Sequence, residues 1–268
     1  MRVAAFQFDV RRGEVAHNLA RVEEGLREAA EREVALVLLP EMWATSFVSD
    51  EDDEGWLARS DEAVDRVRDL SRTLGVAVAG SAFARGAPGQ RLRNRLSLFV
   101  EGEELLGYDK VQLFSPTAEH LGFSPGTRTP PTVEFAGARL SGVVCYDIRF
   151  AQLLRAPFED RAELLLVSAQ WPDGRAPHWR ALCVGRAVEH QSYVLAANRT
   201  GLDVIGRRKL ELAFPGNSLV VSPHGEVLAE GQGASGLVTA DLDLAVVRDL
   251  RRAVPVRLDE RTDLEPAP

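Results

Sequence analysis

The stretch Ala138-Arg-Leu-Ser-Gly-Val-Val-Cys-Tyr-Asp-Ile-Arg149 decides how the rest of the sequence is interpreted. Its apolar run with β-branched Val143 and Val144 predicts a strand, and a charged, helix-compatible segment follows Cys145 at once. At such a corner the first backbone N–H groups of the helix are free, and the positive end of the helix dipole favours a thiolate. Cys145 is therefore a candidate nucleophile, and the alternative is a small buried side chain at a strand end.

The composition is that of an ordinary globular protein, with 268 residues, 45% hydrophobic and 27% charged. The net charge of −8 and the lack of a long basic run argue against a nucleic-acid partner. Only Cys145 and Cys183 are cysteines, which excludes a disulfide framework and suits a reducing cytosol. Since no apolar stretch approaches the ~20 residues that cross a bilayer, we expect a cytoplasmic protein without a membrane partner.

Strands and helices alternate along most of the chain, and several strands then follow in a row, which predicts a layered α/β fold with a mixed sheet. No linker and no repeat is present, so we expect one domain. The expected strands are 2–8, 34–39, 76–83, 93–101, 104–108, 132–135, 138–144, 163–168, 192–198, 217–221, 226–230 and 236–240. The expected helices are 14–33, 61–74, 149–158, 177–191 and 244–252, with a polar loop at 201–216 and an extended tail over about 253–268.

Three reactive side chains come just after predicted strands: Glu41, Lys110 and Cys145. The carboxyl ends of strands gather at one edge of an α/β sheet, where sites usually form. A carboxylate can take the thiol proton, an ammonium can stabilise an oxyanion, and a thiolate can attack a carbonyl carbon. The alternatives are ordinary surface positions for Glu41 and Lys110.

Three segments resemble, in order, the signature segments of the nitrilase superfamily of carbon–nitrogen hydrolases: Leu38-Leu-Pro-Glu-Met42, Tyr108-Asp-Lys-Val-Gln-Leu-Phe114 and Cys145-Tyr-Asp-Ile-Arg-Phe150. Further matches are Arg186-Ala-Val-Glu189 with Tyr193, Asn217-Ser218 and Ser222-Pro-His-Gly-Glu226. The resemblance covers the chain from Val3 to about Asp241. It implies a single carbon–nitrogen hydrolase domain over 1–268, folded as a four-layer α-β-β-α sandwich with mixed sheets.

The resemblance also implies roles for individual residues. Glu41 would be the general base, Lys110 the cation beside the oxyanion, and Cys145 the nucleophile that forms a thioester and releases ammonia. Glu119 matches a second glutamate of the family, and the backbone N–H of Tyr146 would complete the oxyanion site. Subunits of the family commonly pair through the helices next to the nucleophile, so the resemblance implies a homodimer or a higher homo-oligomer.

Within the superfamily, Met42-Trp-Ala-Thr-Ser-Phe47, Gln170-Trp-Pro172 and His178-Trp179 are similar to the bacterial ω-amidase branch. That branch hydrolyses the terminal amide of α-keto acid amides such as α-ketoglutaramate. The implied pocket includes Phe47, Glu119 and Trp171. Alternative substrates are deaminated glutathione, an N-carbamoyl compound or a nitrile.

Arg149 is a candidate ligand of the substrate carboxylate, and the alternative is a structural ion pair with Asp147. After Arg-Phe the family usually has proline, where this chain has Ala151. The resemblance therefore does not predict the backbone geometry directly after the nucleophile.

Two rival interpretations remain from the residues alone. Cys145, His224 and Glu226 could form a cysteine–histidine–glutamate triad, but Pro223-His-Gly225 is typical of a turn between strands, which would point His224 outward. A catalytically silent binding or scaffold protein of the same fold is the alternative from outside the enzymes. The five histidines are scattered and no cluster has ligand spacing, so we expect neither metal nor cofactor.

Overall fold

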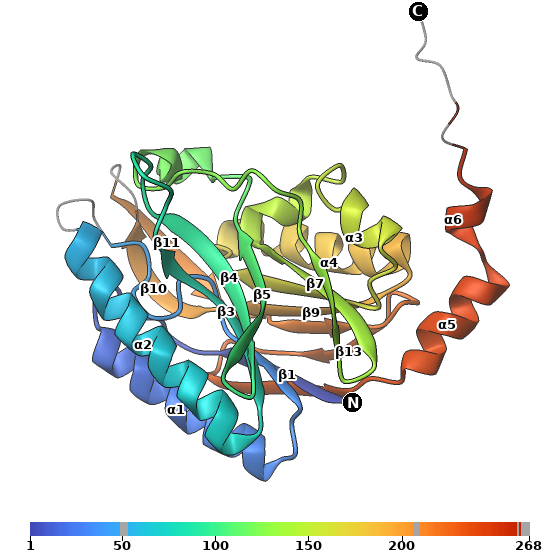
Figure 1. Cartoon of the computed structure of the whole chain (residues 1–268), viewed down its shortest axis with the longest axis horizontal. Helices are drawn as coiled ribbons and strands as arrows, with labels where there is room; N and C mark the ends of the chain where they lie inside the picture. Colours follow the sequence, from blue (N-terminus) through green and yellow to red (C-terminus); the bar gives the residue numbers. More distant parts are fainter. Residues whose placement is uncertain (49–52, 206–208, 262, 264–268) are drawn as a thin grey trace, which may run out of the picture.

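The computed structural model describes residues 1–48, 53–205, 209–261 and 263. Two six-stranded mixed sheets pack face to face, and helices cover their outer faces (Figure 1). This arrangement is the predicted four-layer α-β-β-α sandwich.

The first sheet has the strand order β14-β1-β2-β3-β4-β5. Its strands are β1 (Arg2–Gln7), β2 (Leu36–Leu38), β3 (Ala77–Ala84), β4 (Arg93–Val100), β5 (Glu103–Asp109) and β14 (Gly236–Asp241). Helices α1 (Val15–Glu31) and α2 (Asp53–Leu74) cover it. Strand β2 is parallel to β3, and β4 is antiparallel to both β3 and β5. The carboxyl ends of β2 and β5 therefore lie at the same edge of the sheet.

The second sheet has the strand order β13-β12-β9-β8-β7-β6, with β7, β8 and β9 parallel. Its strands are β6 (Thr132–Phe135), β7 (Ala138–Val144), β8 (Leu164–Ala169), β9 (Tyr193–Asn198), β12 (Leu219–Val221) and β13 (Val227–Glu230). Helices α3 (Arg155–Glu159) and α4 (Ala176–His190) lie beyond its outer face, and α5 (Leu244–Ala253) follows β14 (Figure 1).

The alternation of side chains along β1 shows how the layers form. Val3 and Ala5 join the core between the two sheets, while Ala4 and Phe6 join the core beneath α1 and α2. This is the period of two that a strand covered on both faces requires. Between the sheets, a Cβ on Gly142 would lie 2.5 Å from Leu96 Cδ2, so this glycine of β7 permits the close approach of β4.

The predicted polar loop at 201–216 is wrong. It contains an antiparallel hairpin, β10 (Thr200–Ile205) and β11 (Leu210–Pro215), with residues 206–208 outside the described residues. Along β11 every second side chain is at least partly buried, so the alternation of a half-buried strand is present beneath the polar composition.

The predicted helix over 149–158 is also wrong. Cys145–Arg149 is a single 3-10 turn, and the α-helix that follows is only α3. Pro157 lacks an N–H and its ring would clash with the carbonyl of Leu153, so a helix through this whole segment is excluded. Phe150 is extended and ends the 3-10 turn.

Two other boundaries differ from expectation. Helix α2 begins at Asp53 rather than at 61, and residues 49–52 lie outside the described residues. The expected tail contains the short helix α6 (Val256–Asp259), and Glu260 beyond it pairs with Arg155 of α3. Residues 262 and 264–268 of the tail lie outside the described residues. No helix in the described part of the chain is long and apolar enough to span a membrane.

Candidate active site

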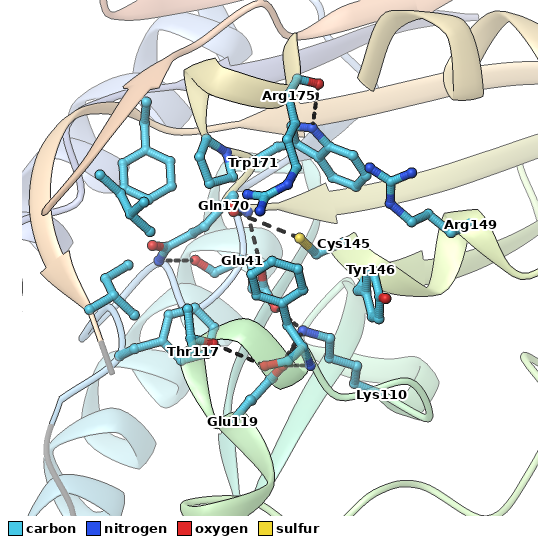
Figure 2. A pocket seen from close by; sticks show the side chains of 16 residues that line it. Glu41, Lys110, Thr117, Glu119, Cys145, Tyr146, Arg149, Gln170, Trp171 and Arg175 are labelled. Carbon is cyan, nitrogen blue, oxygen red and sulfur yellow. Dashed lines mark hydrogen bonds and ion pairs between the residues drawn. The ribbon is translucent and has the colours of Figure 1, made fainter. Parts of the chain in front are cut away.

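The predicted reactive residues meet in one pocket, but they come from both sheets rather than from one sheet edge. Glu41 follows β2 and Lys110 follows β5, whereas Cys145 follows β7 of the second sheet. Glu41, Lys110, Glu119 and Cys145 all line the same pocket and converge in Figure 2. The sandwich therefore builds the site where strand ends of its two sheets come together.

The nucleophile candidate lies at a strained corner. Val144 is extended, and Cys145 has φ +48°, a left-handed conformation that β-carbon residues adopt rarely. Such strain persists where the surrounding structure enforces it, and it is frequent at functional sites. Cys145 as a residue is 8% exposed, and its Sγ lies 3.8 Å from the carbonyl oxygen of Gln170. The corner thus presents the sulfur to the pocket.

The expectation that a helix dipole favours a thiolate at Cys145 is wrong. The segment that begins at Cys145 is a five-residue 3-10 turn, too short to carry the dipole of a full helix. Burial raises the pKa of the Cys145 thiol well above its ordinary value, and the neighbouring Glu41 raises it further. The resting sulfur is a thiol, so attack on a substrate requires a base.

A buried ion cluster provides charged groups beside that thiol. Lys110 Nζ lies 2.8 Å from Glu41 Oε1, and 2.9 and 2.8 Å from the two carboxylate oxygens of Glu119. All three side chains are 1% exposed. Asn94 Nδ2 donates to Glu41 Oε1 at 2.8 Å, and the backbone N–H of Phe114 donates to Glu119 Oε2 at 2.6 Å. Two carboxylates around one ammonium leave the cluster with one excess negative charge.

The pKa shifts of Glu41 and Lys110 suit a carboxylate base beside a permanently protonated lysine. Burial raises the pKa of Glu41; the ammonium of Lys110 opposes this shift and the charge of Glu119 adds to it. Burial alone would lower the pKa of Lys110, but the attraction of Glu119 and Glu41 exceeds it and the pKa lies well above the ordinary value. Lys110 therefore stays protonated, while Glu41 is a stronger base than an ordinary carboxylate.

Gln170 holds the backbone and carboxylate of Glu41, and Arg199 in turn holds Gln170; the sequence singled out neither residue for this role. The Gln170 backbone N–H donates to Glu41 Oε2 at 3.0 Å, and its side-chain amide donates to the Glu41 carbonyl at 2.8 Å. Arg199, fully buried, donates to Gln170 Oε1 at 3.2 Å and pairs with Asp203 at 2.8 Å and Asp9 at 3.2 Å. Arg199 directly follows the buried strand β9. A charged residue in that position is the same sequence signal that identified Glu41, so it could have identified Arg199 as well.

Asp147 joins the strand of Lys110 to the corner of Cys145. Its carboxylate accepts hydrogen bonds from Tyr108 Oη at 2.9 Å, from the Gln112 backbone N–H at 2.7 Å and from the Val144 backbone N–H at 3.2 Å. Burial raises the pKa of Asp147 to about 7, against the effect of Lys110 and these donors. The Asp147 carboxylate thereby fixes the end of β5 in the first sheet relative to the end of β7 in the second sheet.

The alternative ion pair between Asp147 and Arg149 is not formed among the described residues. The Arg149 guanidinium lies 4.9 Å from the ring centroid of Trp171, and its NH2 nitrogen lies 3.0 Å from Nδ1 of His178. Arg149 is thereby turned toward the pocket that it lines.

The predicted substrate-contact residues Phe47, Tyr146, Arg149 and Trp171 all line the pocket. Additional lining residues, which were not predicted as pocket residues although Phe114, Gln170 and Pro172 belong to the matched segments, lie in the loops after β5 and β8 and in the hairpin: Phe114, Thr117, Gln170, Pro172, Arg175, Ile205, Leu212 and Phe214. The walls are thus mainly aromatic and aliphatic, with the ion cluster at one side and two arginines at another (Figure 2).

The rival triad is not assembled. His224 and Glu226 are exposed in the turn between β12 and β13, where Gly225 has φ +82°, and neither lines the pocket of Cys145. Cys183 is buried in α4 within the core, as expected for a packing residue. Over residues 1–48, 53–205, 209–261 and 263, no group of three or more His, Cys, Asp or Glu could hold a metal ion.

Comparison with known proteins gives consistent likenesses over nearly the whole chain. The family model described as carbon-nitrogen hydrolase matches residues 2–252. The 2-oxoglutaramate amidase of Bacillus subtilis (strain 168) is 33% identical over 272 residues, 98% of either chain. Omega-amidase YafV of Escherichia coli (strain K12) is 32% identical over 243 residues, 90% of either chain.

A solved structure gives the same likeness in three dimensions. It is a variant of the amidase from Nesterenkonia sp. AN1 with the acetamide moiety of fluoroacetamide added covalently at its active-site cysteine. The two chains share 30% identity with a TM-score of 0.81, and the match covers 97% of both.

Proposed function

The chain belongs to the carbon–nitrogen hydrolase family and is an enzyme that acts on amides, and we propose that it hydrolyses the terminal amide of a small α-keto acid amide such as α-ketoglutaramate. The observation that carries the proposal is the buried cluster in which Lys110 bridges Glu41 and Glu119 beside the strained corner of Cys145. The likeness to a 2-oxoglutaramate amidase along the whole chain supports the choice of substrate.

In the first half of the reaction, Glu41 accepts the thiol proton of Cys145 while Sγ attacks the amide carbon. The resulting oxyanion is stabilised by the Lys110 ammonium and by the backbone N–H of Tyr146. The carbon–nitrogen bond then breaks, and the leaving nitrogen takes the proton from Glu41 and departs as ammonia. Cys145 is left as a thioester.

In the second half, Glu41 takes a proton from a water molecule, whose oxygen attacks the thioester carbon. The same two donors stabilise the second oxyanion, and the carbon–sulfur bond breaks as the sulfur regains its proton from Glu41. The sum is amide plus water giving carboxylic acid plus ammonia. The raised pKa of Glu41 suits a group that must accept and return a proton in both halves.

Glu119 acts on this chemistry through Lys110. Both of its oxygens contact Nζ, and the Phe114 N–H fixes one of them, so the ammonium is held in one direction. Phe47 and Trp171 provide apolar walls for the acyl chain, and Arg149 provides a cation for the carboxylate of the substrate.

We also propose that residues 1–268 form one carbon–nitrogen hydrolase domain with a C-terminal tail, and that the enzyme is a cytoplasmic homodimer or higher homo-oligomer. The family match over residues 2–252 supports one domain. Val254, Val256 and Leu258 are exposed apolar side chains near the end of the chain, which supports a second subunit there. The two free cysteines support a reducing compartment.

The test is ammonia release from a panel of amides. We expect the highest kcat/KM for α-ketoglutaramate or α-ketosuccinamate, lower values for deaminated glutathione, N-carbamoyl amino acids and butanamide, and none for the Cys145→Ala variant. A higher kcat/KM for deaminated glutathione or an N-carbamoyl compound would make that compound, and not α-ketoglutaramate, the assigned substrate. A folded protein that releases no ammonia and gains no adduct at Cys145 would be a binding protein of this fold.

A further inference from the structure

Two guanidinium groups, those of Arg149 and Arg175, line the pocket. In the ion cluster, the Lys110 ammonium pairs with both Glu41 and Glu119 at 2.8 to 2.9 Å. Arg149 and Arg175 have no carboxylate within ion-pair distance in the part of the chain that the structure describes. A pocket that keeps two unpaired cations is suited to a ligand that brings negative charge or oxygen acceptors.

Arg175 is held in place by contacts in which its guanidinium donates no hydrogen bond to another described residue. It ends the 3-10 turn Asp173–Arg175 just before α4, and its carbonyl oxygen accepts the indole N–H of Trp171 at 2.8 Å. Its guanidinium lies 5.5 Å from the ring centroid of Phe114, and Figure 2 shows the side chain directed into the pocket on the side of Cys145. Stacking on a ring occupies a face of the guanidinium, so its in-plane N–H groups stay available.

Arg149 is more fully engaged. It lies over Trp171 at 4.9 Å and its NH2 nitrogen contacts His178 at 3.0 Å. A single planar guanidinium pairs with a carboxylate along one edge, so the keto oxygen beside that carboxylate is better reached by a donor from a second side chain. Because the ion cluster also carries an excess negative charge, a substrate carboxylate near it needs more than one cation to offset the repulsion.

We propose that Arg175 is a specificity-determining residue that binds the α-keto acid end of the substrate together with Arg149 and disfavours an α-ammonium group. This assignment rests on the proposed function. An α-keto acid end presents three oxygen acceptors and one negative charge, which match two donor-only cations. The corresponding α-amino acid amide, glutamine, presents an ammonium group instead of the keto oxygen, and that group would face two like charges. The pocket therefore selects the keto acid over the amino acid.

The experiment compares kcat/KM for four amides with one reacting group: α-ketoglutaramate, glutaramate, L-glutamine and butanamide. Glutaramate replaces the keto carbon by a methylene, and butanamide lacks the carboxylate as well. In the Arg175→Ala variant we expect kcat/KM for α-ketoglutaramate to fall about 10- to 100-fold, mainly through KM. The ratio of α-ketoglutaramate to glutaramate should fall about tenfold, and the relative rate on L-glutamine should rise. The wild type and the Arg175→Ala variant are assayed with the same substrate solutions. A change in the ratio of kcat/KM values is therefore caused by loss of the Arg175 side chain.

Arg180→Ala is the matched control, because Arg180 lies in the same helix region, pairs with Glu230 and does not line the pocket. It should leave every ratio unchanged, and Arg175→Lys should recover part of the selectivity. Equal losses on all amides, or an unchanged ratio of α-ketoglutaramate to glutaramate, would overturn the assignment while amide hydrolysis stands. A wild-type enzyme that prefers butanamide to both acids would overturn the proposed substrate and the assignment together.

Discussion

Replacing Glu119 by glutamine removes one negative charge from the buried cluster and keeps the shape of the side chain. In the native site its two oxygens accept from Lys110 Nζ at 2.9 and 2.8 Å, and one also accepts the Phe114 N–H at 2.6 Å. An amide offers one oxygen and one NH2 group. Because the ammonium contacts both positions, it faces the NH2 group in either orientation of the amide, and in one orientation the Phe114 N–H faces that group as well.

The cost in stability can be worked from these contacts. A hydrogen bond to a charged group contributes about 1.5–3 kcal/mol. Orphaning a buried charge costs about 3–5 kcal/mol, but Lys110 keeps Glu41 at 2.8 Å, so this full penalty does not apply. We therefore expect the Glu119→Gln variant to lose about 2–3 kcal/mol in its free energy of unfolding.

The same substitution should change the pH dependence of activity. Burial raises the pKa of Glu41, and the charge of Glu119 raises it further. Without that charge the pKa of Glu41 falls, so Glu41 stays ionised to lower pH and becomes a weaker base. The acid limb of kcat/KM should move to lower pH, and kcat at neutral pH should fall about 10- to 100-fold.

Urea unfolding and the pH profile of ammonia release measure these two effects, with Glu103→Gln on the exposed edge of β5 as the matched control. The control should change neither quantity. An acid limb that moves to higher pH in Glu119→Gln, or a kcat equal to that of the wild type, would refute the assigned electrostatics of the cluster.

Three further results are expected. Arg199→Ala should lower kcat about tenfold or more, because Gln170 keeps, among the described residues, only the Ser46 hydroxyl as a donor to Oε1 and its amide is held less firmly toward Glu41; Arg199→Lys should recover part of it, and equal loss in both would argue against this positioning role. Asp147→Asn should lower the free energy of unfolding in urea by about 2–3 kcal/mol, since an amide cannot accept all three donors; an unchanged midpoint would contradict this. Burial lowers the pKa of His190 to about 4, so the folded state excludes a proton that the unfolded chain binds below about 6.5. Stability should fall by up to about 3 kcal/mol as the pH drops from 6.5 to 4, and His190→Gln should flatten that slope in urea titrations.

The positions that the sequence predicted well are those with a local signal. Glu41, Lys110 and Cys145 each follow a predicted strand, and in the structure the strands end three residues before Glu41 and one residue before Lys110 and Cys145. Burying a charge without a partner is costly, so a charged residue at the end of a buried strand indicates a partner or a site. The four-layer fold came from the resemblance of the signature segments and is confirmed.

The positions that the sequence could not predict depend on contacts between distant segments. Arg175 enters the pocket because its carbonyl oxygen binds Trp171 and its guanidinium stacks on Phe114, a residue 61 positions earlier in the chain. The hairpin β10–β11 was hidden by its polar composition. The conformation of the Cys145 corner is set by Asp147, whose three donors come from β5, from the loop after it and from β7.

The central claim is that the acyl group of the substrate passes through a thioester on Cys145. Mass spectrometry of the enzyme, quenched with acid during turnover of α-ketoglutaramate and then digested, tests it directly. An acyl adduct on the peptide that contains Cys145, absent from Cys145→Ala together with ammonia release, is the predicted result. Ammonia release by Cys145→Ala, or an adduct on Cys183 alone, would contradict it.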